Sequence, residues 1–210
     1  MNGPTPQSTE PGGRQRRGKG HERRRRIFRS LHDCIVSKGY QKTTLADIAE
    51  SADMTPSHLL YYFKGKEDIL EQYFLNVSVR FMATLDGFTQ LPRREQIGAL
   101  TDFWFRGEAS TMQEIGFMLE CFGTAVHDPV LKGTKAEFDH HCKAYLRQIM
   151  EQAEQPMLTS SKDAAELAYS MMIGLRSAVY FDDDTTLDDA HRLFSQTMFT
   201  LCGDSPAQAG

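Results

Sequence analysis

The chain has 210 residues, of which 40% are hydrophobic and 25% are charged, and this apolar content excludes a disordered chain. No apolar run approaches the roughly 18–20 residues that span a bilayer, and the N-terminal residues lack the hydrophobic stretch of a secretory signal, so we expect a cytoplasmic protein. The net charge of −4 is unevenly distributed: residues 1–66 carry 13 Lys and Arg against 6 Asp and Glu, whereas residues 67–210 carry 11 against 22. A basic first third favours a nucleic-acid partner at that end, and a basic tail that is simply solvated is the alternative.

The first predicted elements are a flexible basic arm and a helix. Residues 1–21 are rich in Gly, Pro, Gln, Ser and Arg without periodicity, and they cannot bury enough apolar surface to become ordered. Apolar residues then recur at helical spacing over 22–38, and Gly39 provides the stop. The four arginines at 23–26 are either solvated or additional phosphate contacts.

Two short helices with a tight turn between them are predicted next. Thr44, with a carboxylate three residues later, indicates the capped start of one helix. Thr55 followed by Pro56 indicates the start of the other, because proline at the first helical position gives up no needed donor. Leu59 and Phe63 would anchor this second helix inward. Such a pair forms a helix-turn-helix, whose second helix can lie in the major groove of DNA.

Helical periodicity continues through the rest of the chain, and no run shows the sustained alternation of a strand. A connector helix is predicted from Glu67 to about residue 86. We therefore predict an all-α protein of about nine helices, in which a three-helix N-terminal domain precedes a helical C-terminal domain. The later helices are expected near 93–109, 112–126, 129–154, 162–181 and 186–202.

The stretch GYQKTTLADIAESADMTPSHLLYYFKGKEDIL, residues 39–70, resembles the N-terminal domain of the TetR family of transcriptional regulators. The resemblance implies a homodimer that binds a roughly palindromic DNA operator, with a divergent C-terminal half that dimerises and usually senses a small molecule. It divides the chain into the arm at 1–21, a DNA-binding domain at 22–68, a ligand-binding and dimerisation domain at 69–203 and a tail at 204–210. The residues that carry the resemblance are Gly39, Tyr40, Thr43, Thr44, Leu45, Ile48, Ala49, Ala52, Met54, Thr55, Ser57, Leu59, Tyr62, Phe63, Gly65, Lys66, Glu67 and Leu70.

By position, the resemblance assigns three groups of residues to DNA. Phosphate contacts at the start of the second helix would be Thr43 and Thr44. The recognition helix would start at Thr55, and its base contacts would be Pro56, Ser57 and His58. Contacts to the DNA backbone beyond it would be Tyr61, Tyr62 and Lys66. The tyrosines could instead close the small domain as half-buried aromatics, and the histidine and lysine could be ordinary surface residues.

Two positions depart from the family pattern. Asp53 stands where the turn glycine is usual, and Asp tolerates left-handed backbone geometry better than most residues, so we expect the turn to persist with modest strain. Leu60 stands where a tyrosine facing DNA is common, so we expect one backbone contact to be missing.

The C-terminal half is first of all a helical core, but its Met and aromatic residues can also form pocket walls. The resemblance implies a pocket among the middle helices and a mostly apolar ligand, and it implies that the last two helices pair across a dimer. The residues proposed for this pocket are Trp104, Met118, Cys121, Phe122, Tyr145, Met172 and Arg176.

The sequence lacks a nucleophile elbow, a phosphate-binding loop, a paired-carboxylate signature and a C-x-x-C pair. The segment EFDHHC at 137–142 holds metal-ligand residue types, but they fall on opposite faces of a helix and cannot all converge without other help. We therefore expect no enzymatic activity, no cofactor and no metal. The function expected from the resemblance is a repressor that a small effector releases from its operator. The alternative is a ligand-independent DNA-binding or chromosome-organising factor of the same fold.

Overall fold

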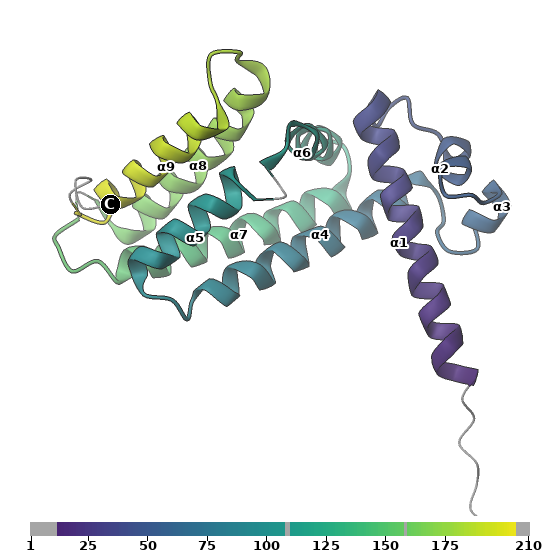
Figure 1. Ribbon diagram of the computed structural model, residues 1–210, viewed down its shortest axis with the longest axis horizontal. Coiled ribbons are helices and arrows are strands. Elements are labelled where there is room, and N and C mark those ends of the chain that lie inside the picture. Colours follow the sequence, from purple (N-terminus) through teal and green to yellow (C-terminus); the bar gives the residue numbers. More distant parts are fainter. Residues whose placement is uncertain (1–11, 108–109, 158, 205–210) are drawn as a thin grey trace, which may run out of the picture. The chain divides into compact units, whose positions relative to one another are not determined.

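A computed structural model describes residues 12–107, 110–157 and 159–204, with side chains from residue 20 onward (Figure 1). Within these ranges the chain forms nine helices and no strand, which confirms the predicted all-α class. The chain divides into two compact units, Met1–Leu70 and Glu71–Gly210. None of the helices in the described ranges is long and apolar enough to cross a membrane.

The first unit contains three helices and the first turn of a fourth. The core of this unit contains buried apolar side chains of the long first helix, including Ile27 and Leu31. It also contains Ile48 and Leu59 of the two short helices. These short helices start where the capping residues predicted. The three helices are α1 (Gly12–Lys38), α2 (Leu45–Ser51) and α3 (Pro56–Leu59).

The flexible arm predicted for residues 1–21 needs correction in its second half. Residues 1–11 lie outside the described residues, but α1 begins at Gly12, whereas we predicted a start at residue 22. Half of the residues over 12–21 are Arg, Gln or Lys, which are good helix formers, although the segment also contains four glycines, which are poor ones. Adding residues to an existing helix also avoids the cost of nucleation, so a segment without an apolar face of its own can extend α1.

Helix α4 (Lys66–Phe88) begins in the first unit and continues without interruption into the second. Glu67 and Asp68 lie in its first turn, where acidic side chains favour the positive end of the helix dipole. The observed helix extends the predicted connector by about one residue at its start and two at its end, which is within the usual uncertainty of helix boundaries.

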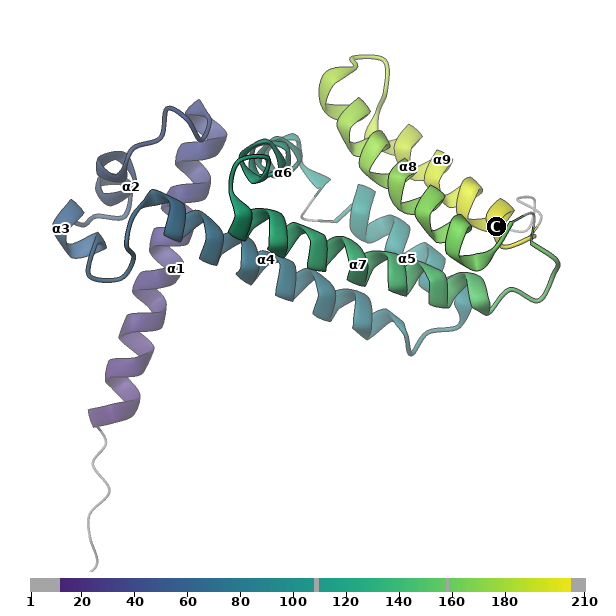
Figure 2. The ribbon, with the colours of Figure 1, turned by 180° about the vertical axis from the view of Figure 1, so that it is seen from behind.

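The second unit is a bundle in which α8 and α9 lie side by side, with α7 against α8 and α5 against α9 (Figures 1 and 2). Most of its helices begin at a side-chain cap: Thr111, Asp128, Ser160 and Thr186 each accept a hydrogen bond from a backbone amide of the helix that follows. The helices are α5 (Arg93–Phe105), α6 (Met112–Ala125), α7 (Pro129–Glu151), α8 (Ser161–Phe181) and α9 (Leu187–Leu201).

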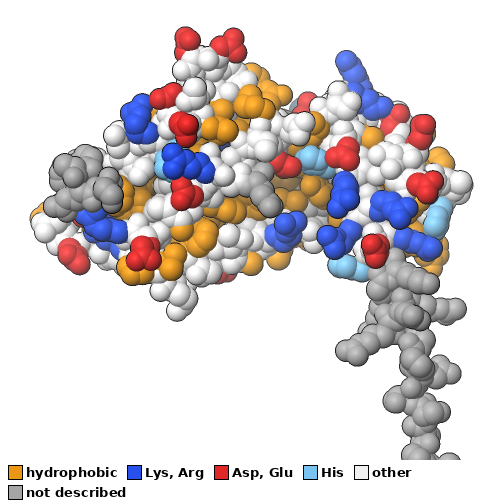
Figure 3. Space-filling view, in the orientation of Figure 1, with side chains coloured by type: hydrophobic (Ala, Val, Ile, Leu, Met, Phe, Trp, Pro, Cys, Tyr) orange, Lys and Arg blue, Asp and Glu red, His pale blue; other side chains and the backbone are white. Residues whose placement is uncertain are grey.

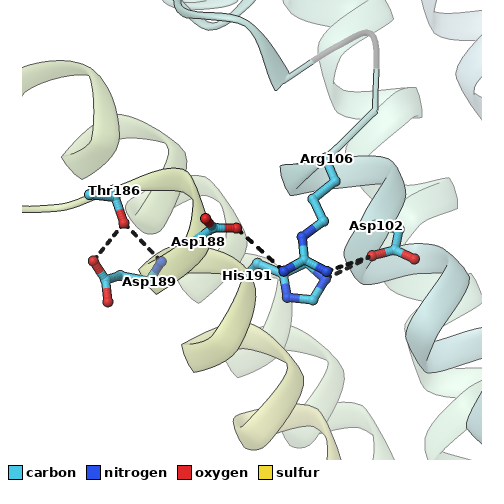
Figure 4. A network of polar contacts seen from close by, with 6 residues as sticks. All are labelled: Asp102, Arg106, Thr186, Asp188, Asp189 and His191. Atoms are coloured by element: carbon cyan, nitrogen blue, oxygen red, sulfur yellow. Dashed lines mark hydrogen bonds and ion pairs between the residues drawn. The ribbon is translucent and has the colours of Figure 1, made fainter.

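A polar network joins one end of α5 to α9 on the surface of the bundle (Figure 4). The Arg106 guanidinium lies 3.3 Å from the Asp188 carboxylate and 3.8 Å from that of Asp102. The His191 imidazole Nε2 also lies 2.8 Å from Asp102. Exposed pairs of this kind contribute little each, so the network orients the helices more than it stabilises them.

A more buried ion pair joins the segment after the other end of α9 to the start of α5. Gly203, with φ of 74°, ends α9 in left-handed geometry, and the next residue, Asp204, points its carboxylate at Arg93. The two side chains are 2.7 Å apart and only 8% and 12% exposed. This ion pair therefore fixes the C-terminal end of the bundle.

Candidate nucleic-acid interface and effector cavity

The turn between α2 and α3 is a compact Schellman turn. The Met54 amide donates to the carbonyl of Ala49, and the Asp53 amide donates to that of Glu50. Asp53 occupies the left-handed position with φ of 55°, as the sequence predicted, and among the described non-glycine residues it alone has a positive φ. The turn thus keeps its geometry without the usual glycine and presents α3 in a fixed orientation to α2.

The start of α2 carries one exposed and one buried threonine. Thr44 caps the helix in a reciprocal capping box with Asp47 and is exposed. A side-chain hydrogen bond from Lys38 is the largest cause that lowers the pKa of Asp47, and the Thr44 contacts lower it further. Thr43, in contrast, is 1% exposed and its hydroxyl donates to the Gly39 carbonyl at 2.8 Å. Its side chain therefore does not fit the predicted phosphate contact.

The start of α3 is exposed and polar. The Thr55 hydroxyl accepts a hydrogen bond from the His58 amide at 3.2 Å, and Pro56 follows at the first helical position. Ser57 and His58 are also exposed, while Leu59 is fully buried. These four neighbouring residues are therefore accessible from outside the protein, which the predicted base contacts of Pro56, Ser57 and His58 require.

The residues after α3 differ in how freely they face solvent. Tyr61 is 82% exposed and Leu60 is 49% exposed. Tyr62 is half-buried and its hydroxyl accepts a hydrogen bond from Arg23 at 3.1 Å. Lys66 is directed back into the first unit, where its ammonium donates to the Tyr40 carbonyl at 3.1 Å and lies 4.2 Å from the Tyr40 ring centroid. Lys66 thus has a structural contact besides any contact to DNA.

The arginines at 23–26, in the middle of α1, contact the helix-turn-helix, a role that the sequence left open. Besides the Arg23 bond to Tyr62, the Arg24 guanidinium lies 4.7 Å from the Phe63 ring centroid, and Arg26 donates to the Ala52 carbonyl at 3.4 Å. Basic side chains gather on the face of the first unit in Figure 3, interspersed with acidic ones. The arginines therefore combine a packing role with a positive field around the recognition helix.

The second unit contains a mostly apolar cavity of about 60 Å³. Four of the seven residues predicted for a pocket line it, namely Trp104, Met118, Phe122 and Arg176. The other three, Cys121, Tyr145 and Met172, are buried in the helical core outside this lining, because periodicity marks an inward face without separating core from cavity wall. The sequence missed Phe74, Val77, Ser78, Phe81, Glu114, Phe117 and Phe138.

The missed residues Phe74 to Phe81 belong to α4, which sequence analysis interpreted only as a connector. Their spacing of three and four residues marks one face of the helix, and this signal was present in the sequence. The helix that begins in the first unit therefore forms one wall of the cavity in the second.

Arg176 is the most unusual cavity residue, because it is charged and only 2% exposed. Its Nη1 donates to the Trp104 carbonyl at 2.6 Å, and its guanidinium lies 5.5 Å from the Trp104 ring centroid. Burial lowers the pKa of Arg176 to about 10, and the charge of Glu114 opposes this shift. The guanidinium therefore remains protonated at neutral pH.

Residues 27–73 match the family model for bacterial regulatory proteins of the tetR family. The match spans the buried residues of α1, both short helices and the first turns of α4. Residues 27–73 therefore form a domain of the TetR-family type. No curated protein matches the sequence of this chain.

Solved structures resemble this chain in fold over most of its length. A TetR transcription regulator from Haloarcula marismortui has a TM-score of 0.77 at 16% identity, covering 86% of this chain and 98% of its own. A transcriptional regulator from Rhodococcus sp. Rha1 has a TM-score of 0.75 at 13% identity, covering 86% and 96%. A structure from Saccharomonospora viridis in complex with choline has a TM-score of 0.74 at 18% identity, covering 84% and 95%. At these identities the likeness is one of fold.

Proposed function

We propose that this protein is a homodimeric repressor that binds a palindromic operator through α3 and is released by a small ligand in the cavity of the second unit. In this proposal residues 22–68 bind DNA, and residues 69–203 bind the effector and dimerise. The observation that carries the DNA part is the cluster of exposed Thr55, Ser57 and His58 at the start of α3, held by the Schellman turn. Because chromosomal DNA is its partner, we expect the protein to act in the cytoplasm.

The operator can be found by selection from random duplexes and its binding measured by fluorescence anisotropy. We expect His58→Ala to weaken operator binding by roughly 1–3 kcal/mol and to leave binding to random DNA unchanged, because a base contact carries the sequence preference. His140→Ala is the matched control, since His140 is also exposed but lies on α7. Equal losses on operator and random DNA would contradict a base contact, and an intact chain with no sequence preference would contradict the operator itself.

The cavity supports the effector part, because α4 contributes Phe74, Val77, Ser78 and Phe81 to its wall. A ligand that fills or widens the cavity would press on the helix that continues into the DNA-binding domain. The present space holds only a few water molecules. An effector larger than this requires the surrounding helices to move apart, which couples binding to a change of conformation.

The release of DNA is tested separately from DNA binding itself. A ligand that binds the cavity should weaken operator affinity, and the operator should weaken ligand affinity by the same factor, because coupling between two sites is reciprocal. If a ligand occupies the cavity and the operator affinity stays constant, the ligand-independent alternative is favoured.

The dimer part rests on the outward face of α8. Leu167, Met171, Gly174, Ala178 and Phe181 follow one another at spacings of four and three residues, and each is at least partly exposed. Regular spacing of this kind forms the seam between packed helices. Among the described residues, no side chain lies within 4 Å of the position that a Cβ of Gly174 would take, so a second helix could approach closely there.

A further inference from the structure

The charges in the cavity of the second unit indicate the class of ligand that it takes. This inference rests on the proposed effector role of the cavity. Its wall is mainly apolar, with six aromatic rings besides Val77 and Met118, so the body of the ligand should be apolar and compact. The polar groups in the lining are Ser78, Glu114 and Arg176, which include one acidic and one basic side chain.

The acidic and the basic group differ in their access to water. Arg176 is 2% exposed and is held by the Trp104 carbonyl and ring. Glu114 lies in the first turn of α6 and is partly exposed. Glu114 therefore already has access to solvent, whereas the guanidinium of Arg176 has none.

This difference decides which ligand charge the cavity tolerates. With a cationic ligand, two positive charges would share the one carboxylate of Glu114, and one of them would stay uncompensated in the apolar interior at a cost of several kcal/mol. A neutral ligand would leave the charges as they are and gain only apolar contact. An anionic ligand would compensate the buried guanidinium directly, while the displaced carboxylate of Glu114 becomes solvated. Guanidinium groups bind carboxylates especially well, because two parallel hydrogen bonds can form.

We propose that the cavity binds a small apolar monocarboxylate, whose carboxylate pairs with Arg176 while Glu114 turns outward. The aromatic wall would enclose the apolar body of the acid, with the ring centroids of Phe81, Trp104 and Phe138 between 5.7 Å and 6.3 Å from one another. The choline in the Saccharomonospora viridis structure is a cation, so the proposed class differs from what that relative binds.

The test uses three probes with one phenyl body and different charges: phenylacetate, phenylacetamide and phenethylammonium. Their binding to the full-length protein is measured by isothermal titration calorimetry in the absence of DNA. We expect phenylacetate to bind roughly tenfold more tightly than the amide, and the ammonium to bind most weakly. Glu114→Gln removes the competing carboxylate, so it should tighten phenylacetate binding by at least roughly fivefold and weaken the ammonium further.

Glu120→Gln is the matched control, because it removes one negative charge from α6 at an exposed position outside the cavity lining. It should leave the affinity for all three probes within about twofold of the unmodified protein. The proposal is overturned if the acid binds no better than the amide, if Glu114→Gln weakens or does not change acid binding, or if none of the probes binds at millimolar concentration.

The ligand class and the effector role fail in different ways. If phenylacetate binds as expected but operator affinity does not change in its presence, the effector role fails and the ligand class stands. If the ammonium binds most tightly and releases the operator, the ligand class fails and the effector role stands.

Discussion

Asp53 is the residue at which the local backbone of the DNA-binding unit is most strained. Its φ of 55° places the Cβ close to the following carbonyl, which costs an ordinary L residue about 1–2 kcal/mol. Asp bears less of this cost than most residues, because its short polar side chain can bond locally. The two Schellman hydrogen bonds around it are in place, so the surrounding turn holds the residue in this conformation.

We expect Asp53→Gly to raise the free energy of unfolding by up to about 1 kcal/mol, because glycine adopts left-handed geometry without steric cost. Asp53→Ala should lower it by a similar amount, since alanine keeps the Cβ and loses the polar side chain. Urea unfolding followed by circular dichroism measures both. If the Gly and Ala variants were equally stable, the left-handed backbone at this position would not be the cause of a change in the free energy of unfolding.

Single residues of the candidate DNA interface could be predicted from the sequence only where a local rule applies. Thr44 and Thr55 are helix caps, so their place at a helix start followed from their neighbours in the chain. The burial of Thr43 and the inward direction of Lys66 depend on Gly39 and Tyr40. Contacts that depend on tertiary packing cannot be predicted from residue spacing. A family pattern also contains residues with a structural role besides those that touch DNA, and it does not distinguish the two.

At the scale of elements, the two ends of α9 are held by contacts of different strength. The Arg106–Asp188 pair at its start joins side chains that are 55% and 84% exposed, whereas the Arg93–Asp204 pair beyond its end joins side chains that are 12% and 8% exposed. The hydrogen bond from Arg93 is the largest cause that lowers the pKa of Asp204. A carboxyl group with a lowered folded-state pKa stabilises the fold above its unfolded pKa, and this contribution disappears as pH falls through the folded value.

We therefore expect Asp204→Asn to lower stability by about 2 kcal/mol at pH 7, the magnitude of a lost hydrogen bond to a charged group. The difference between the two proteins should shrink as pH falls below about 4, the ordinary pKa of an aspartate, because protonation weakens the pair in the unmodified protein. Thermal unfolding at a series of pH values measures this. Asp188→Asn is the control and should change the melting temperature little. A difference between wild type and Asp204→Asn that is independent of pH would exclude the ion pair as its source.

The helices themselves were largely predictable, because each has its own periodic apolar face and most begin at a capping residue. The predicted starts at Thr44 and Thr55 and the helix of the last segment agree with α2, α3 and α9 to within a residue or two. The predicted start of α1 at residue 22 was wrong, because no apolar face marks residues 12–21 as helical. The role of α4 in the cavity was missed because one face of a helix does not reveal which neighbours it meets.

At the scale of the whole molecule, the proposed regulation requires a connection from the cavity to the dimer interface, in addition to the connection from the cavity through α4 to the DNA-binding domain. Close packing between α6 and α8 offers one. A Cβ at Gly116 of α6 would lie 2.7 Å from Cε2 of Tyr180, so the tyrosine ring rests against the glycine. Because Glu114 and Phe117 beside it line the cavity, a displacement of α6 would reach α8 directly.

The dimer itself is tested at the outward face of α8. Leu167 and Phe181 are 57% and 72% exposed, although both are large apolar residues, and we expect them to be buried against a second copy. Leu167→Glu combined with Phe181→Glu should produce monomers, because a carboxylate in an apolar interface must be desolvated without a partner. Sedimentation equilibrium measures the association. Operator binding by anisotropy should weaken at least roughly 100-fold, since a dimer joins two recognition helices on half-sites about 34–36 Å apart and gains from their linkage.

The matched control is Val126→Glu, which introduces the same charge at a side chain that is 69% exposed at the end of α6. This variant should remain dimeric and bind the operator with nearly unchanged affinity. Circular dichroism and thermal unfolding of the α8 double variant separate a monomer from an unfolded chain, because a folded monomer keeps the helical signal of α1 to α9. A folded double variant that remains dimeric would place the interface elsewhere, and monomers that bind the palindrome as tightly as the unmodified protein would rule out a dimer as the DNA-binding form.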